Sequence, residues 1–293
     1  MRHRVDHDQV KSLATQRLSW AEVGARAGCT PSYARMIAGG KMKLRSEGAV
    51  TLSRQEPQTL SGKSASLPAY DHPALMDGKT IYPSTVVNIG EFDVLKSAFN
   101  SAKIGKRITK GRWKDFPVFT LTLEERATCP TACKHWRSCF GNHMQFAQRF
   151  VAGAALERRL EDEVAARAMQ HRGGFAVRLH VLGDFYSVEY VDLWRRLIDK
   201  HPELHVFGFS ARWDYHHDII AKSLIDLAGE RWDRFAIRFS NAPVDECSTI
   251  SIEHPYQKPE DAIICPQQLG QTSSCSTCAL CWQTKRRIAF LQH

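Results

Sequence analysis

Residues 175–241 read FAVRLHVLGDFYSVEYVDLWRRLIDKHPELHVFGFSARWDYHHDIIAKSLIDLAGERWDRFAIRFSN. Three stretches of this segment are short and apolar, and the two stretches between them carry apolar residues at helical spacing. The apolar stretches recur about every thirty residues, which is typical of repeated βαβ units. We therefore predict an α/β fold, with a parallel sheet or a partial β/α barrel. The strands are expected at 175–182, 204–210 and 235–240, and the helices at 188–200 and 216–228.

The same alternation continues on both sides of this segment. Upstream, the pattern predicts a strand at 116–123 and a long helix at 144–170. Downstream, two further short strands are expected at 247–252 and 262–265. The α/β domain is therefore expected to cover residues 80–293.

Small and polar residues occupy the end of each predicted strand of the central segment. They are Gly183-Asp184 at the end of the first strand, Ser210 and Arg212 at the end of the second, and Asn241 at the end of the third. In parallel sheets and β/α barrels the active site lies beyond the carboxyl ends of the strands. We therefore expect these residues to lie close to a functional site.

A first cluster of cysteines follows the strand at 116–123. Cys129, Cys133 and Cys139 are separated by three and five residues, on a predicted loop. Three thiolates could hold a [4Fe–4S] cluster and leave one iron open for the amino and carboxylate groups of a small molecule. The alternative is a zinc site completed by His135 or His143.

A second cluster lies near the C-terminus and contains four cysteines, Cys265, Cys275, Cys278 and Cys281. Its two Cys-x-x-Cys steps favour an iron–sulfur cluster over zinc, because zinc sites more usually separate two such pairs by a longer stretch. The remaining cysteines, Cys29 and Cys247, are expected to be packing residues.

The N-terminal segment is basic and helical. Of the net charge of +9, residues 1–54 supply a surplus of six, with ten Lys/Arg against four Asp/Glu. Helices are predicted at 8–18, 20–27 and 31–38, with a capping box at Ser19-Trp-Ala-Glu22. This order resembles a helix-turn-helix, in which Ala25 and Gly28 would lie where two helices come close. The basic charge and the helix order together favour DNA as a partner.

The third helix of this segment would then enter the major groove of DNA. The residues expected to contact DNA are Ser32, Tyr33 and Arg35 from that helix, with Lys41, Lys43 and Arg45 reaching phosphates. The alternative is a helical adaptor that does not bind DNA. Residues 1–45 would form this domain, and residues 46–79, which lack an apolar period, would form a flexible linker.

The composition of the chain limits the cellular compartment and the class of protein that we expect. Hydrophobic residues make up 43% of the chain, which is enough for a packed core. The chain has no apolar run of about 18 residues and no apolar stretch of the kind found in signal peptides. We therefore expect a cytoplasmic protein without a membrane partner, in a compartment where clustered cysteines favour metals over disulfides.

Some residues are predicted to be structural. The tryptophans at 194, 213 and 232 are expected to pack in the core. His180 is expected to be hydrogen-bonded in place on its strand, and His216-His217 to be solvated.

The arrangement of residues 116–265 resembles that of a divergent radical S-adenosylmethionine enzyme. In that family three cysteines after the first strand of a partial β/α barrel hold a [4Fe–4S] cluster. The open iron binds S-adenosylmethionine, and one electron cleaves it to a 5′-deoxyadenosyl radical. Cys129, Cys133 and Cys139 match in place and in the first spacing, whereas the second gap is five residues where the family usually has two.

This resemblance also implies roles for the strand ends. Gly183-Asp184 occupies the place of the Gly-Gly-Glu-like stretch, so Asp184 would hold the amino group of S-adenosylmethionine. Ser210, Arg212 and Asn241 would meet its carboxylate or ribose. The family often carries an additional cluster after the barrel, which fits the four C-terminal cysteines.

Roughly residues 80–285 also resemble an uncharacterised phage family called gene product 88. The shared motifs are Cys139-Phe-Gly-Asn142, Gly183-Asp184-Phe185 and Cys278-Ala-Leu-Cys281. This resemblance implies a phage, prophage or plasmid setting and no particular reaction.

Two functions follow from the sequence. The first is an iron–sulfur enzyme of the radical S-adenosylmethionine kind, supplied by an electron donor and acting on a nucleic acid or nucleotide. The alternative is a non-enzymatic DNA-binding protein with structural zinc or redox-sensing cysteine sites.

Overall fold

The computed structural model describes residues 5–16, 18–38, 67–90, 92–243 and 247–292. The chain divides into two compact units, Met1–Gln55 and Glu56–His293. Lys41, Lys43 and Arg45 lie outside the described residues, as does most of the predicted linker.

The N-terminal unit consists of three short helices, α1 (His7–Ala14), α2 (Trp20–Arg26) and α3 (Pro31–Ala38). The predicted capping box of α2 is present, because the Ser19 and Glu22 side chains each accept the other residue's backbone N–H. The apolar faces of the helices meet in a small core that contains Val10, Val23 and Ile37. Cys29 packs against this core, as predicted.

The close approach between α2 and the following turn lies one position from where the sequence predicted it. A Cβ atom on Gly24 would lie 2.7 Å from the carbonyl oxygen of Cys29, whereas Ala25 is exposed. Gly28 has open space around it and is required instead for its φ of +67°. Sequence spacing alone could not distinguish a glycine needed for a close approach from one needed for a positive φ.

The body is an α/β unit around an eight-stranded sheet of order β2-β3-β5-β6-β7-β8-β10-β9. Only β2 runs antiparallel to its neighbour, and the other pairs are parallel. The α/β fold and the parallel sheet are confirmed, and the sheet has two separate edges, β2 and β9, in place of barrel closure. The strands are β2 (Lys96–Ser97), β3 (Val118–Thr120), β5 (Phe175–Leu179), β6 (Leu204–Ser210), β7 (Phe235–Ser240), β8 (Ser248–Ile252), β9 (Ile263–Ile264) and β10 (Ile288–Leu291).

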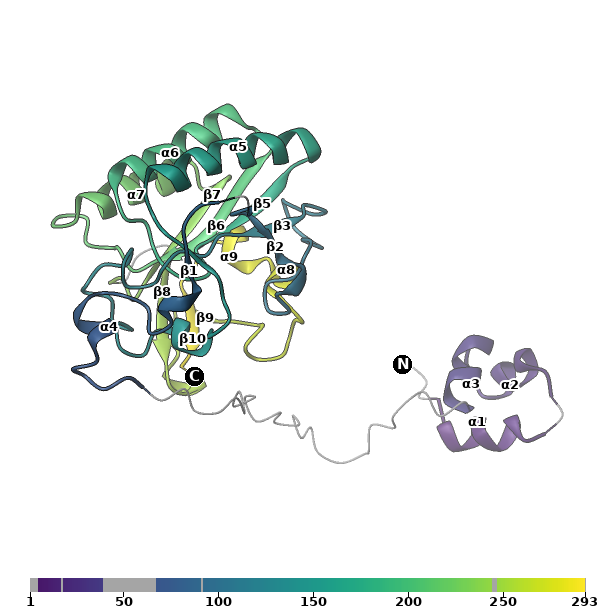
Figure 1. Cartoon of the computed structure of the whole chain (residues 1–293). Coiled ribbons are helices and arrows are strands. Elements are labelled where there is room, and N and C mark those ends of the chain that lie inside the picture. Colours follow the sequence, from purple (N-terminus) through teal and green to yellow (C-terminus); the bar gives the residue numbers. More distant parts are fainter. Residues whose placement is uncertain (1–4, 17, 39–66, 91, 244–246, 293) are drawn as a thin grey trace. The chain divides into compact units, whose positions relative to one another are not determined.

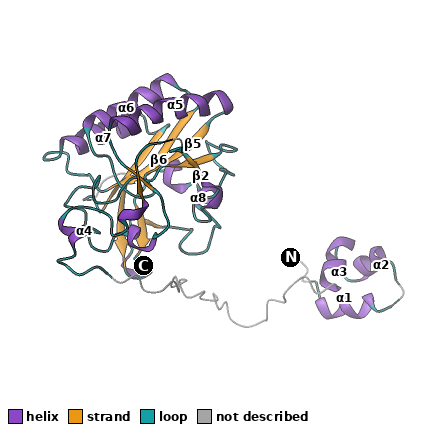
Figure 2. Ribbon diagram, in the orientation of Figure 1, coloured by secondary structure: helices purple, strands orange, loops and turns teal. Residues whose placement is uncertain are grey.

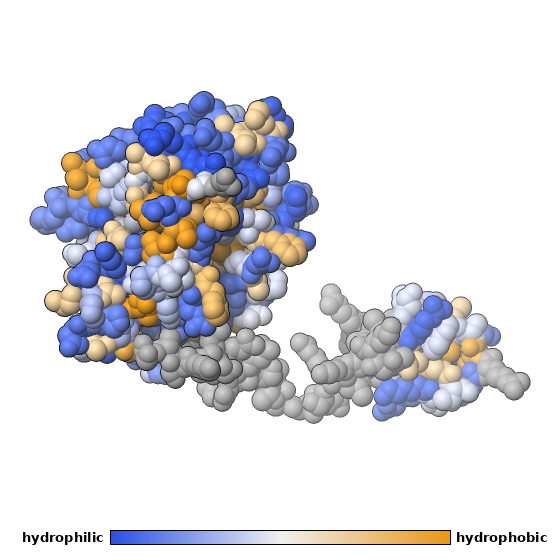
Figure 3. Space-filling view, viewed as in Figure 1, coloured by the Kyte–Doolittle hydropathy of each residue, from blue (hydrophilic) through white to orange (hydrophobic). Residues whose placement is uncertain are grey.

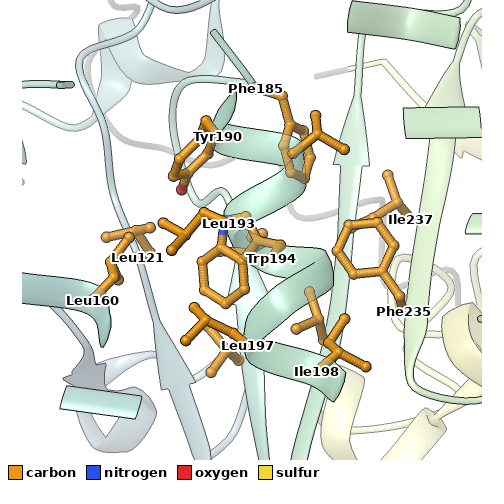
Figure 4. Close-up of a cluster of buried hydrophobic side chains, with 14 of the residues drawn as sticks. Leu121, Leu160, Phe185, Tyr190, Leu193, Trp194, Leu197, Ile198, Phe235 and Ile237 are labelled. Atoms are coloured by element: carbon orange, nitrogen blue, oxygen red, sulfur yellow. The ribbon is translucent and has the colours of Figure 1, made fainter. Parts of the chain in front are cut away.

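Three helices cover one face of this sheet: α5 (Ala154–Gln170), α6 (Val188–Lys200) and α7 (Ile219–Glu230) (Figures 1 and 2). Helix α6 begins at the Ser187 cap, and its buried residues recur at helical spacing. Trp194 lies at the centre of the core that α6 forms with the sheet (Figure 4). Every second residue of β5, such as Val177, points to this core.

The opposite face of the sheet is packed by loops and by α9 (Leu280–Gln283). Alternate strand residues such as Ala176 and Phe207 point to this side. Trp113 and Trp282 stack there with ring centroids 5.5 Å apart. Both faces are therefore covered, which explains the nearly continuous apolar sequence of the strands.

Helix α5 begins ten residues later than the sequence predicted, because part of the segment before it forms a strand instead of a helix. Residues Arg149–Phe150 form β4, which pairs in parallel with β1 (Val86–Val87). Gly153, with a φ of 128°, then separates β4 from the helix. Strand β10, which was not predicted from the sequence, inserts between β8 and β9.

Residues 67–79, assigned to the linker from sequence, contact the body where the structure describes them. They contain the short helix α4 (Pro73–Met76), with Leu75 buried. The Trp136 Nε1 donates to the carbonyl oxygen of Leu75, and Arg137 Nε donates to that of Pro68. The sequence of this segment has no apolar period, so its long-range contacts could not be predicted from a sequence pattern.

The surface of the body mixes hydrophilic and apolar side chains. On the face seen in Figure 3, hydrophilic residues dominate the helix layer, and apolar residues gather nearer the centre. Within the part of the chain that the structure describes, no helix has both the length and the apolar character needed to cross a membrane.

Candidate functional site

The first cysteine loop leaves the carboxyl end of β3 and carries Cys129, Cys133 and Cys139, each partly buried. Burial raises the pKa of all three thiols, and that of Cys139 reaches about 11. The backbone N–H of Gly141 donates to Cys139 Sγ at 3.4 Å. Backbone N–H groups also favour the thiolates of Cys129 and Cys133 and partly oppose the rise in their pKa. The loop therefore offers backbone donors to each of its three sulfurs.

The three thiols are close enough for their charges to interact. Charge on Cys133, on Cys139 and on the Asp184 carboxylate each raises the pKa of Cys129. The Asp184 N–H donates to Thr128 Oγ1 at 3.0 Å, so Asp184 lies beside this cysteine loop at the carboxyl ends of β3 and β5. Among the described residues, however, no group of three or more His, Cys, Asp or Glu side chains is placed as the ligands of a metal ion.

A buried ion pair between Arg149 and Glu125 stabilises this loop. Arg149 and Glu125 are 0% and 1% exposed, and Arg149 Nε lies 2.6 Å from Glu125 Oε2. Arg149 also donates to the carbonyl oxygens of Gly141, Met144 and Ala147, which belong to the loop. A single guanidinium thus ties the end of the loop to its beginning.

A second buried arginine ties the middle of the loop. Arg126 donates to the Trp136 carbonyl oxygen through Nε and to Asn142 Oδ1 through Nη2, at 2.9 and 2.7 Å. Asn142 in turn donates to the carbonyl oxygen of Arg137. Gly141 is confined, because a Cβ there would lie 2.6 Å from Glu125 Oε1. The Gly-Asn pair after Cys139 is therefore explained by packing of the loop on its own support.

The carboxylate of Asp184 is engaged within the protein. Its Oδ1 accepts from Ser210 Oγ at 2.7 Å and from the Phe185 N–H at 2.8 Å, and its Oδ2 accepts from the Ala211 N–H at 2.7 Å. Burial raises the pKa of Asp184 to about 6, against these hydrogen bonds. Asp184 therefore joins the ends of β5 and β6, and its role as an S-adenosylmethionine ligand stays a prediction.

The other strand-end residues also make internal contacts. Gly183 has a φ of +85°, and a Cβ there would lie 2.6 Å from Thr128 Oγ1 in the cysteine loop. Arg212 pairs with Asp218 at 2.7 Å and donates to the Phe185 carbonyl oxygen. Asn241 Oδ1 accepts from the Ser251 N–H at 3.3 Å. The structure thus brings Gly183, Asp184, Ser210 and Arg212 together beside the first cysteine loop.

The histidines proposed for a zinc site have other contacts. The two ring nitrogens of His135 lie 3.3 Å from Ser138 Oγ and from Ser251 Oγ. The ring of His143 packs near that of Phe140. Zinc binding by His135 would require loss of one of these serine contacts.

The second cysteine cluster lies on the other side of the sheet from helices α5 to α7. Cys275 and Cys278 bound the one-turn helix α8 (Cys275–Cys278), Cys281 lies in α9, and Cys265 follows β9. All four cysteines line a single cavity of about 10 Å³, the room of about one water molecule. Burial raises the pKa of Cys281 to about 12, and Cys265, Cys275 and Cys278 add to this rise. A cluster of four irons exceeds this room, so binding one would require the cysteine-bearing segments to move apart.

A larger cavity of about 400 Å³ opens beside the carboxyl ends of β6 and β7. Its walls include Trp213, Tyr215, Phe239 and the acidic side chain of Asp214. Trp213 is 40% exposed, so the prediction that it packs in the core is wrong. The volume lies in the range of small-molecule sites, about 300–1,000 Å³.

The remaining single-residue predictions divide as follows. His180 is buried and lies 3.0 Å from Tyr190 Oη through Nε2, which confirms that it is hydrogen-bonded in place. Cys247 packs in the core of the second sheet face, as expected. In the N-terminal unit, Ser32 and Arg35 are exposed, and the Arg35 guanidinium lies 5.7 Å from the centroid of the Trp20 ring. The Tyr33 side chain lies outside the described part of the structure.

These features define a class of protein: an α/β unit with a mostly parallel sheet and two cysteine-bearing loops. The family model called Gene product 88 matches residues 95–284. The chain therefore belongs to this phage family, which confirms the resemblance found in its motifs. Comparisons with curated proteins and with solved structures found no match.

Most of the residues that support these sites were not predicted from the sequence. Glu125, Arg126 and Arg149 carry no motif, and only their burial shows that they hold the first loop. The aromatic wall of the larger cavity carried one possible signal, the Trp-Asp-Tyr run directly after the end of β6 at residues 213–215.

Proposed function

We propose that this protein is an iron–sulfur enzyme whose reactive cluster is held by Cys129, Cys133 and Cys139. The observation that carries the proposal is the first cysteine loop, where three partly buried cysteines lie on one loop beside Asp184 and the Gly141 N–H donates to Cys139 Sγ. Hydrogen bonds to cluster sulfurs are a principal means by which proteins stabilise iron–sulfur clusters and set their potential.

Three cysteines leave one position of a four-iron cluster without a protein ligand. A cluster of this kind supplies an electron and an open iron to which S-adenosylmethionine can chelate. The protein's own contribution is to orient and enclose: the Glu125–Arg149 pair holds the loop, and Asp184 joins the β5 and β6 ends that face it. The four C-terminal cysteines would hold a second metal centre.

The cavity beside Trp213 is the proposed substrate pocket. Its aromatic walls suit a flat ring, since base–aromatic stacking contributes about 1–3 kcal/mol per base. Asp214 could accept a hydrogen bond from an exocyclic amino group, although it already contacts His217 at 3.0 Å. This chemistry favours a nucleobase, in agreement with a nucleotide or nucleic-acid substrate.

The first test is metal and sulfide analysis of the full chain purified without oxygen, together with its visible spectrum. We expect iron and sulfide in equal amounts and a brown colour, lost in part when Cys129, Cys133 and Cys139 are all replaced by Ser. With S-adenosylmethionine and a reductant, the protein should form 5′-deoxyadenosine, and the triple variant should not. If the protein contains zinc and has no visible colour, the enzyme proposal is wrong, and the alternative is a DNA-binding protein with structural zinc sites.

The pocket has a separate test with a matched control. Trp213→Ala should weaken binding of a nucleoside, measured by fluorescence titration, about 5- to 150-fold if stacking contributes about 1–3 kcal/mol. Tyr256→Ala is the control, because Tyr256 is 82% exposed and does not line the cavity. Equal loss in both variants would contradict the assignment.

We propose that the N-terminal unit binds duplex DNA through α3. Ser32 and Arg35 are exposed on this helix, and the helix order agrees with a helix-turn-helix. Arg35→Ala should weaken DNA binding in fluorescence anisotropy and, if Arg35 contacts a phosphate, reduce the salt slope by about one. An unchanged affinity would favour the helical adaptor.

A further inference from the structure

Two arginines point from the sheet toward the second cysteine cluster. Arg178 lies on β5 and Arg238 on β7, at alternate positions that face away from helices α5 to α7. Arg238 is 0% exposed, and Arg178 is only partly exposed. The Arg178 guanidinium stacks over Phe209 at 4.8 Å, and that of Arg238 lies 5.5 Å from the Trp232 ring centroid.

Both guanidinium groups donate only to carbonyl oxygens in the described part of the chain. Arg238 donates to Cys281 at 2.9 Å, to Arg286 at 3.0 Å and to Thr284. Arg178 donates to His180 at 2.9 Å and to Leu179. These bonds satisfy N–H groups but do not balance the positive charges.

The groups that could balance these charges are cysteines. Cys281 packs against the core on this face of the sheet, and its carbonyl oxygen accepts from Arg238. Among the described residues, no carboxylate lines the cavity of the four cysteines. The charges of Cys275 and Cys281 act on Arg178, and those of Cys281 and Cys247 act on Arg238. A neutral thiol carries no counter-charge, whereas a metal-bound thiolate does. Buried charges are costly unless they are paired, so anionic cysteines would stabilise this arrangement.

We infer that Arg178 and Arg238 are the counter-charges of an anionic metal complex of Cys265, Cys275, Cys278 and Cys281. A tetrathiolate complex of iron–sulfur or zinc type carries negative charge and would neutralise both guanidinium groups. Lys103 adds a third cation, since it favours the thiolates of Cys265 and Cys275. The inference rests on the proposed function only in placing a metal at these cysteines.

The test measures metal affinity in the full chain with Cys129, Cys133 and Cys139 replaced by Ser, so that only the second site reports. Arg178→Met and Arg238→Met should each lower the affinity for ferrous or zinc ion, by chelator competition, about 10- to 100-fold. Arg178→Lys keeps the charge and should retain most of the affinity. The control is Arg172→Gln, because the Arg172 side chain is 74% exposed.

A second measurement separates charge from packing. In metal-free protein, Arg178→Met should leave the urea midpoint unchanged or raise it, because it removes an unpaired charge. A lowered midpoint with a parallel loss of affinity would show a packing role and overturn the inference. If Arg238→Met fails to fold, Arg178 decides the question.

The outcomes also distinguish this inference from the proposed function. If the second site binds zinc alone and no 5′-deoxyadenosine forms, the enzymatic proposal fails, and the arginine test proceeds with zinc. If no metal binds to the four cysteines, or if both Met variants bind as tightly as the parent, the inference fails even where the three-cysteine loop binds iron.

Discussion

The two cysteine sites differ in how their surroundings balance charge. Around the first loop the buried groups cancel, because Glu125 and Asp184 stand against Arg126 and Arg149. Around the second cavity the described groups do not cancel, because no carboxylate lines the cavity while Arg238 donates to the carbonyl oxygen of Cys281 and Arg178 lies on the same face of the sheet. The first loop can therefore hold its shape without a bound metal, whereas our inference makes the second site depend on anionic sulfur. Support by an internal ion pair and support by a bound metal are two different ways to order a cysteine loop.

The largest expected effect comes from breaking the charge balance of the first loop. Arg149→Met removes the close partner of the buried Glu125, which keeps only the Thr80 hydroxyl and a longer contact with Arg126 at 4.0 Å. This variant should lower the free energy of unfolding by about 3–5 kcal/mol. Urea denaturation measures this loss. The control is Arg195→Met, whose partly exposed pair with Glu230 should contribute at most about 1 kcal/mol. Similar losses in both variants would contradict the special role of the buried pair.

Next come two glycines, one packed against each loop. Gly183→Ala would place a Cβ 2.6 Å from Thr128 Oγ1 in the first loop, and Gly105→Ala would place one 2.1 Å from Ser276 Oγ in the second. Both positions have positive φ, so each variant should lose about 1–3 kcal/mol. Gly173→Ala, with no atom within 4 Å, serves as the control. If the regions are independent, Gly183→Ala should leave metal affinity at the second site unchanged.

Acid should destabilise the end of β5 through His180. Burial lowers the pKa of this imidazole to about 3, from an ordinary value of 6.5. The unfolded chain therefore binds an extra proton below pH 6.5, so this stability is present above pH 6.5 and is lost as the pH falls toward 3, at about 1.4 kcal/mol per pH unit. Urea midpoints at pH 7, 6 and 5 should converge for His180→Gln and the parent. The exposed His217→Gln should show no such convergence.

The smallest effect is expected at the start of α8, in the second loop. The Ser274 side chain accepts the N–H of Thr277, so Ser274→Ala should cost about 1 kcal/mol. It should also speed modification of Cys275 and Cys278 by a thiol reagent in metal-free protein. Ser19→Ala removes the same kind of cap from α2 and should leave that rate unchanged. Equal rates in both variants would show that the cap does not order the second cysteine site.

Much of the central fold could be predicted because its residues act locally. The bounds of α6, β6 and β7 agree with the sequence prediction, since helical spacing, a serine cap and apolar runs bounded by polar residues define them. The segment before α5 was predicted wrongly because Arg149 and Phe150 are held by β1 and Glu125, far away in sequence. Strand β10 was missed because its four residues become a strand only between β8 and β9.

By itself the sequence determined the α/β class, the three N-terminal helices and the two cysteine clusters, because periodicity, caps and cysteine spacing are properties of neighbouring residues. Only the tertiary structure decided which charges meet the cysteines. Asp184 and Arg212 looked like ligands and are engaged in internal contacts, whereas Arg238 carried no motif and lies beneath the second cluster. Burial and long-range pairing decide the cost of a charge, and neither is written in local spacing.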